Sequence, residues 1–336
     1  MARRTFLKNN AIDSLSLALI LYGLKSNKFK EEESRGMISC LPRIVEKCSE
    51  PLSAQNVGNA LYGLQGMSSD DKVVRLLVRA LSGQVATCTE PFTAQNVDNA
   101  LYGLQGMSSD DPGVRSLVRA LSGPVARCTE PLDSQEVGNA FYGLQRMRSD
   151  NADVRSLLDA LYHHLYSRYR YRYFWPVHLN FFLLDAQAVG NALYGLQGMS
   201  SDDADVRTPL YPLLGQVATC TEAFTAQDVG NALYGLQGMS GDDADVRLLV
   251  HALSGHVARC TKPPDAQAVS NALYGLQGMS SDVEDVRLLV RALSGHMATC
   301  TEAFTAQDVG NALYGLHGMS GDDADVRLLV RALCRV

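Results

Sequence analysis

The stretch Asn59–Leu64, NALYGL, decides the fold because it returns along the whole chain. Six further copies, one of them with Phe in place of Leu, begin at Asn99, Asn139, Asn191, Asn231, Asn271 and Asn311. The steps between these asparagines are 40, 40, 52, 40, 40 and 40 residues, and a cruder copy, LILYGL, starts at Leu19. A period of this length is typical of solenoids, in which each unit buries its apolar face against its neighbours. The sequence therefore predicts an array of about eight units with one insertion.

The first half of each unit has the features of a short capped helix. Ser53 is a favoured N-cap type, and Val57, Ala60, Leu61 and Leu64 follow it at the i, i+3, i+4, i+7 spacing of one buried helix face. Cap residues of similar type recur at the matching positions: Thr93, Asp133, Asp185, Thr225, Asp265 and Thr305. A left-handed glycine at position 66 is expected to end this helix.

A second apolar stripe, from Val74 to Cys88, predicts a second helix in the unit. Asp71 and Arg75 stand four residues apart and are expected to form an ion pair at its start. Gly83 is expected to bend or break this helix. The equivalent helix of a later unit contains Pro209 and Pro212, and proline in a helix interior predicts a break or kink.

An all-α fold is predicted because each unit contains two helices. The units lack the alternating leucine pattern that strand-containing repeats require. The predicted architecture is an α-solenoid of about eight two-helix repeats, forming a superhelix. Residues 1–161 are assigned to repeats 1–4, the first one degenerate, and residues 184–336 to repeats 5–8, the last one truncated. Residues 162–183 form an insertion in which arginines 168, 170 and 172 alternate with tyrosines 169, 171 and 173. This pattern suits single-stranded nucleic acid, and a scrambled stretch of repeat is the alternative.

The composition excludes several classes of protein. The net charge of −6 counts against a large phosphate-binding surface, and no apolar run reaches the roughly 18 residues of a membrane helix. Cysteines recur at one position of the unit: Cys48, Cys88, Cys128, Cys220, Cys260 and Cys300. Stacked helices hold such residues about 8–10 Å apart, too far for disulfides, so buried free thiols are expected and a reducing compartment fits.

A polar row is predicted on the face of the first helix opposite the apolar stripe. Gln55, Asn59 and Tyr62 share that face, and every later unit repeats the triplet. The candidate site residues are Gln55, Asn59, Tyr62, Gln95, Asn99, Tyr102, Gln135, Asn139, Tyr142, Gln187, Asn191, Tyr194, Gln227, Asn231, Tyr234, Gln267, Asn271, Tyr274, Gln307, Asn311 and Tyr314. Amides bind base edges and tyrosines stack on bases, which suits RNA. Alternatively, Asn and Tyr bond between neighbouring helices and hold the stack together.

One neighbouring position varies from unit to unit. It holds Asn56, Asn96, Glu136, Ala188, Asp228, Ala268 and Asp308. Such variation suits a residue that selects among ligands. It also suits an indifferent surface position near a helix start, where acidic residues are favoured.

The motif [SDT]-x-Q-x-V-x-N-A-L-Y-G-L, followed by a second amphipathic helix at a period near 40, resembles the octotricopeptide-like repeats of organellar RNA-binding proteins. It is similar also to repeats of RAP-domain proteins and of the RNA-editing substrate-binding complex. The resemblance covers nearly the whole chain. It implies RNA processing, stability or editing in a mitochondrion or plastid; without it, a cytoplasmic location is expected.

Two functions follow as expectations. The first is a non-enzymatic adaptor that binds single-stranded RNA. The second is a protein–protein scaffold that binds a peptide or partner helix in the solenoid groove. An enzyme is the least expected class, because the histidines are scattered and the chain has no HExxH, phosphate-loop or Ser/His/Asp pattern. No cofactor, metal or membrane association is expected.

Overall fold

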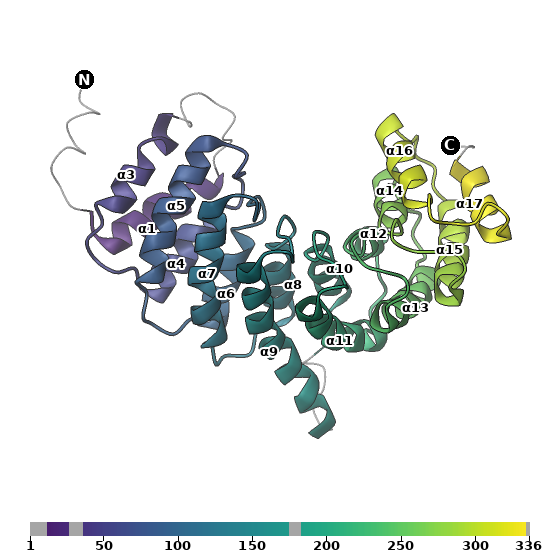
Figure 1. Cartoon of the computed structure of the whole chain (residues 1–336), viewed down its shortest axis with the longest axis horizontal. Helices are drawn as coiled ribbons and strands as arrows, with labels where there is room; N and C mark the ends of the chain where they lie inside the picture. Colours follow the sequence, from purple (N-terminus) through teal and green to yellow (C-terminus); the bar gives the residue numbers. More distant parts are fainter. Residues whose placement is uncertain (1–11, 27–35, 175–182, 334–336) are drawn as a thin grey trace. The chain divides into compact units, whose positions relative to one another are not determined.

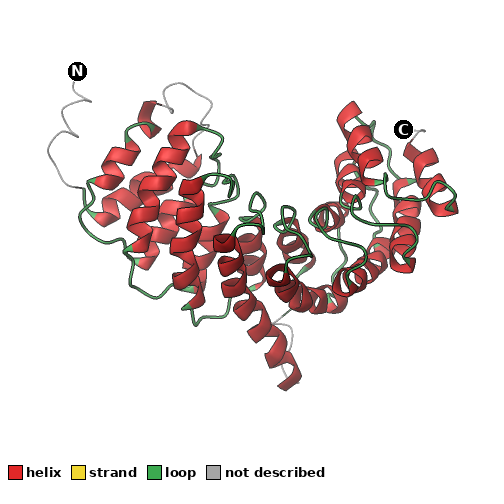
Figure 2. Cartoon of the chain, viewed as in Figure 1, coloured by secondary structure: helices red, strands yellow, loops and turns green. Residues whose placement is uncertain are grey.

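The computed structural model describes residues 12–26, 36–174 and 183–333, with the side chains of 167–174 outside the description. In these ranges the chain forms sixteen α-helices and one short 3-10 helix, η2 (Gly23–Ser26), joined by loops (Figure 2). Alternate helices along the chain pack side by side, which gives two helices per repeat of about 40 residues. The all-α repeat fold predicted from the sequence is confirmed.

The chain divides into two compact units (Figure 1). Unit 1 comprises residues 1–132 and 146–161. Its first-helix layer contains α1 (Ser14–Tyr22), α4 (Ala54–Tyr62) and α6 (Ala94–Tyr102). Its second-helix layer contains α3 (Leu41–Glu46), α5 (Lys72–Ala86), α7 (Pro112–Ala126) and the first part of α9 (Ala152–Phe174).

Unit 2 comprises residues 133–145 and 162–336. Its first-helix layer contains α8 (Ser134–Tyr142), α10 (Ala186–Tyr194), α12 (Ala226–Tyr234), α14 (Ala266–Tyr274) and α16 (Ala306–Gly315). Its second-helix layer contains α11 (Ala204–Thr219), α13 (Ala244–Arg259), α15 (Glu284–Met297) and α17 (Ala324–Leu333).

The predicted N-caps start the first helices. The Ser53 side chain accepts the backbone N–H of Asn56, and the matching residues of all six later repeats do the same in their own helices. The apolar stripe behind the cap is buried: Val57, Leu61 and Leu64 have no exposed surface. The resulting helix α4 has nine residues. An isolated helix of this length is marginally stable in water, so the packing of its apolar stripe must stabilise it.

The glycine of NALYGL allows the first helices to approach one another closely. A Cβ on Gly103 would overlap the carbonyl oxygen of Leu61, and one on Gly235 would overlap that of Leu193. No described glycine has a positive φ, so the expected left-handed stop at Gly66 is wrong. The helix tightens instead, because the N–H groups of Leu64 and Gln65 bond carbonyls three residues back.

The turns between the two helices of a repeat are bonded to the turns of the next repeat. The hydroxyl of buried Ser69 accepts the N–H of Ser108 at 2.8 Å, and Ser201 and Ser281 repeat this contact in unit 2. Arg75 donates from Nη1 to the carbonyls of Ser69 and Asp70, and its Nε lies 3.7 Å from Asp111 Oδ2 of the next repeat. The recurring arginine therefore stabilises the turn.

The second helices tolerate the expected helix breakers. Helix α5 continues past Gly83 to Ala86, and α11 runs through both Pro209 and Pro212. The predicted breaks of these helices are therefore wrong. Tertiary packing offsets the lost hydrogen bonds, since both prolines are buried in the second-helix layer. The predicted insertion begins inside helix α9, whereas its segment 175–182 lies outside the described residues.

A glutamate of the following loop adds a second cap to most first helices. Glu90 Oε2 accepts the N–H of Ala54 at 2.9 Å, and Glu130 does the same for Ala94. In unit 2, Oε2 of Glu222 and of Glu302 accepts the backbone N–H of Ala186 and of Ala266, respectively. The corresponding residue for α12 is Lys262.

We expect Lys262→Glu to raise the free energy of unfolding by about 0.5–1 kcal/mol, because it restores an acidic cap at the N-terminus of α12. Urea denaturation followed by circular dichroism measures the change. Lys262→Gln is the control, since it removes the positive charge without supplying a carboxylate. Equal gains for both variants would mean that charge removal alone, and not the cap, stabilises the helix.

Candidate functional site

The structure places the predicted triplet along one edge of the first-helix layer in each unit. All seven glutamines of the row, from Gln55 to Gln307, are exposed, and all seven asparagines are half-buried. The tyrosines are half-buried as well, except Tyr314, which is 54% exposed. The row is therefore reachable from solvent at every repeat, most fully at the glutamines.

The tyrosines stack on one another and form a column in each unit. In unit 1, Tyr62 lies between Tyr22 and Tyr102, with ring centroids 5.8 and 5.9 Å apart. In unit 2 the column runs through Tyr142, Tyr194, Tyr234, Tyr274 and Tyr314, with spacings of 5.3–5.6 Å. These distances are those of favourable aromatic pairs, worth about 0.5–1.5 kcal/mol each beyond burial. A ring inside the column already has both faces covered.

A second ladder, of glutamines, accompanies the tyrosines in unit 2. Gln237 Nε2 donates to Gln197 Oε1 at 3.4 Å, and Gln277 donates to Gln237 at 3.3 Å. Burial raises the pKa of Tyr194 and Tyr234, while hydrogen bonds from Gln197 and Gln237 act in the opposite direction. This ladder was not predicted from the sequence. Its signal was present, because glutamine follows YGL in nearly every repeat.

The variable position is directed into the joint between first helices. Asn56, Asn96, Asp228, Ala188 and Ala268 are buried there. Asn96 and Asp228 complete capping boxes, accepting the N–H of their own N-cap residue. At these five repeats the position is therefore not an indifferent surface site, whereas Glu136 and Asp308 are half-buried. Its size and polarity decide how the joint between two repeats is filled.

Lysine and arginine are absent from the seven first helices that carry the triplet, α4, α6, α8, α10, α12, α14 and α16. Two exposed arginines of the second helices pair with aspartates of the next repeat. Arg119 makes two bonds to Asp153, of 2.8 and 2.9 Å, and Arg291 pairs with Asp325 at 3.0 Å. The hydrogen bonds that Arg119 donates to Asp153 raise the pKa of Arg119. The glutamines and asparagines of the triplet, from Gln55 and Asn59 to Gln307 and Asn311, are called the amide row below. These helices therefore present neutral hydrogen-bonding groups along the amide row and add no positive charge to it.

The cysteines of the repeat are buried packing groups. The seven described cysteines are free thiols, five of them buried and Cys260 half-buried. Burial raises the pKa of Cys48, Cys88, Cys220 and Cys260. These four thiols are therefore held in the protonated form, which is a poor nucleophile and a poor metal ligand. Among the described residues, no cluster of three or more His, Cys, Asp or Glu side chains is arranged to hold a metal.

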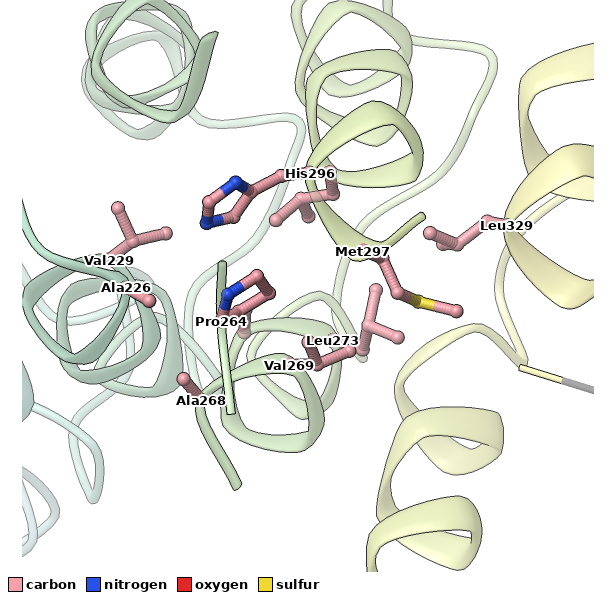
Figure 3. A pocket seen from close by; sticks show the side chains of 11 residues that line it. Ala226, Val229, Pro264, Ala268, Val269, Leu273, His296, Met297 and Leu329 are labelled. Atoms are coloured by element: carbon pink, nitrogen blue, oxygen red, sulfur yellow. The ribbon is translucent and has the colours of Figure 1, made fainter. Parts of the chain in front are cut away.

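A small apolar pocket lies where Pro264 replaces the phenylalanine of neighbouring repeats. Figure 3 shows the His296 ring above Pro264, with Val229 and Met297 on either side. The pocket measures about 10 Å³, the space of about one water molecule. Nε2 of His296 is buried without a hydrogen-bond partner in the described structure, and burial lowers the pKa of this histidine.

The preceding repeat shows what this pocket lacks. There His256 stacks on Phe224 at 4.1 Å, and its Nε2 lies 2.8 Å from the carbonyl oxygen of Val217. Burial lowers the pKa of His256 too. We interpret the Pro264 pocket as a packing defect, because it is too small for a ligand.

No described helix combines the length and the apolar character needed to cross a membrane. A scan against protein-family models found no match. A search of curated proteins also found no match.

Proposed function

We propose that this helical repeat protein is a non-enzymatic scaffold that binds an extended polypeptide segment along its amide row. The row itself carries the proposal: each of the seven repeats from Gln55 onward offers the same exposed glutamine and half-buried asparagine, at the same place on its first helix. A surface that repeats one chemical group at every step matches a ligand that also repeats one group. A polymer backbone has this property, and a varied sequence of side chains does not.

The chemistry of the amides favours a peptide backbone over a nucleic-acid backbone. Asn and Gln each offer a carbonyl acceptor and two N–H donors, and a peptide offers one N–H and one C=O per residue. A phosphate backbone offers negatively charged acceptors and is bound mainly through Lys and Arg. The first helices supply no such cations, and the net charge of −6 favours a basic segment.

Single-stranded RNA remains the second candidate. The resemblance to octotricopeptide-like repeats supports it, and so does the ability of amides to bond base edges. Base stacking on the tyrosines, however, competes with the tyrosine columns. Rings 5.3–5.9 Å apart would have to separate before a base could enter between them. An RNA complex would therefore rely on the amides and on the tyrosine hydroxyl edges.

Two labelled probes distinguish the candidates: a 20-residue peptide of alternating Lys and Thr, and an oligouridine of 20 nucleotides. We expect fluorescence polarisation to show tighter binding of the peptide at 150 mM salt. Changing Gln187, Gln227 and Gln267 to Ala should weaken that binding about tenfold, a loss of about 1.4 kcal/mol. The melting temperature should stay unchanged, because these side chains are exposed.

A matched control changes Thr208 and Leu248, exposed residues of α11 and α13, to Ala. It should bind the peptide as the wild type does. Tighter binding of the oligouridine, weakened by the glutamine changes, would replace the peptide proposal with the RNA one. Peptide binding that is insensitive to the glutamine changes would contradict the assignment of the row.

A further inference from the structure

A polar depression of about 250 Å³ lies between α8 and α10, the two first helices that the 52-residue step connects. Two pairs of amides from the candidate row line it: Gln135 and Asn139 from α8, and Gln187 and Asn191 from α10. Asp185, the N-cap of α10, adds a carboxylate. The volume is below the roughly 300–1,000 Å³ of small-molecule sites, so it suits a single side chain.

A combination of two residues distinguishes this joint. The variable position holds Ala188, as Ala268 does in the α12–α14 joint, whereas Asn96 and Asp228 place a polar side chain at the matching position of other joints. Position 134 holds serine, whereas the other six described copies from Ala54 onward have alanine there. The Ser134 hydroxyl donates to Asp185 Oδ2 at 2.9 Å and accepts the Asp185 N–H at 2.9 Å. Alanine leaves the space open, and serine fixes the carboxylate beside it.

The depression is rich in acceptors and has no cation in its lining. Asp185 Oδ1 accepts the N–H of Ala188 at 2.7 Å, and Oδ2 accepts from Ser134. An ionised carboxylate has about four lone-pair sites, so acceptor capacity remains on both oxygens. The four amides make no hydrogen bond with other described residues, so their carbonyl oxygens are available too.

The group that best matches this arrangement is a guanidinium. It is planar, always charged, and presents five N–H donors that pair with a carboxylate through two parallel bonds. A lysine ammonium has three donors and is more strongly hydrated, so it gains less from amide acceptors. A nucleobase would bring acceptors of its own beside the Asp185 carboxylate, which is unfavourable.

We propose that the α8–α10 depression holds the guanidinium of one arginine side chain of the bound polypeptide. This inference rests on the proposed function, because the amides of the same row would bind the backbone on either side. An arginine pocket at one joint would fix the position of the peptide along the amide row. Backbone recognition alone allows a peptide to slide by one repeat, whereas one arginine pocket fixes a single position.

The first test uses three fluorescent 12-residue peptides of alternating Ser and Thr, with Arg, citrulline or Lys at the centre. Citrulline keeps the shape of arginine and removes its charge. We expect the arginine peptide to bind about tenfold more tightly than the citrulline peptide, with the lysine peptide between them. Asp185→Asn should reduce the arginine-to-citrulline ratio to near one. Asparagine is itself a good N-cap, so this change keeps α10 capped.

Two further variants separate the pocket from general effects. Ala188→Asn fills the depression with the residue found at position 96 and should also abolish the preference for arginine. Asp265→Asn is the matched control, because Asp265 caps α14 as Asp185 caps α10. It should leave the preference unchanged. Equal loss in Asp185→Asn and Asp265→Asn would overturn the assignment of the pocket.

An NMR titration with N-acetyl-arginine methylamide makes the two proposals separable, since it needs no bound peptide. We expect it to shift the side-chain amide signals of Asn139 and Asn191 in the wild type and not in Asp185→Asn. Shifts without any peptide binding would support the arginine pocket and contradict the proposed function. Peptide binding without preference for arginine would support the proposed function and contradict the arginine pocket. Larger shifts with adenosine monophosphate than with the arginine derivative would overturn the pocket in favour of a nucleobase.

Discussion

Gly235→Ala is expected to destabilise the protein by about 3 kcal/mol or more, the upper range for overpacking a tight interface. Gly235 has φ −62° and ψ −19°, a conformation that alanine adopts freely, so the cost is steric. The new Cβ would meet the carbonyl oxygen of Leu193, far closer than the roughly 3.5–4.0 Å optimum for non-bonded atoms. Because the obstacle is backbone, α10 and α12 would have to separate.

Urea denaturation followed by circular dichroism measures this effect. Separation at one joint should also lower the cooperativity, since the stability of an array depends on contacts between neighbouring repeats. Gly295→Ala is the control: nothing lies within 4 Å of its added Cβ, and the residue is inside helix α15. There alanine should stabilise by about 0.5–1 kcal/mol. Equal stability of the two variants would show that the close approach at Gly235 is not required.

Tyr234→Ala is the second large change, with an expected loss of roughly 2–3 kcal/mol, below the 3–5 of a fully buried aromatic. Tyr234 is half-buried and stacks on Tyr194 at 5.4 Å and on Tyr274 at 5.3 Å. Truncation removes both contacts at once. Tyr234→Phe keeps the ring and should cost less than about 1 kcal/mol.

The end of the column offers an internal comparison. Tyr314 is 54% exposed and stacks on the tyrosine of one neighbouring repeat, Tyr274, at 5.6 Å. Tyr314→Ala should therefore lower the melting temperature much less than Tyr234→Ala. If Tyr234→Ala kept full stability but weakened RNA or peptide binding, the tyrosine row would be a contact surface, as one interpretation of the sequence predicts.

The periodic features of the fold could be predicted because they are local. Asp185 and its equivalents cap helices through atoms three residues away, and the stripe of Val57, Leu61 and Leu64 reports burial by its spacing. The glycine of NALYGL is different. Its role depends on the backbone of the preceding repeat, 40 residues away, so no local rule identifies it.

Features of the candidate site were harder to predict, for the same reason. The helical spacing of Gln55, Asn59 and Tyr62 predicts that they share one face, and the exposure along the row agrees with it. Spacing within one helix could not show that Tyr62 stacks between two equivalent rings. Nor could it show that Ala188 leaves a depression, because that space depends on α8 as well as α10.

The joints within each unit are built from nearly the same residues, with the same glycine against the same carbonyl. Each repeat is therefore interchangeable with its neighbour in register. Removing 40 residues, from one NALYGL to the next, would join two surfaces that already fit. Recombination between such similar gene segments would lengthen or shorten the protein by whole repeats and leave a foldable product. A single residue added or lost inside a packed helix would instead turn the residues that follow it away from that joint, whereas the 52-residue step shows that extra residues between helices are tolerated. The helices of this protein are thus constrained against small changes in length, whereas the number of repeats is free to change.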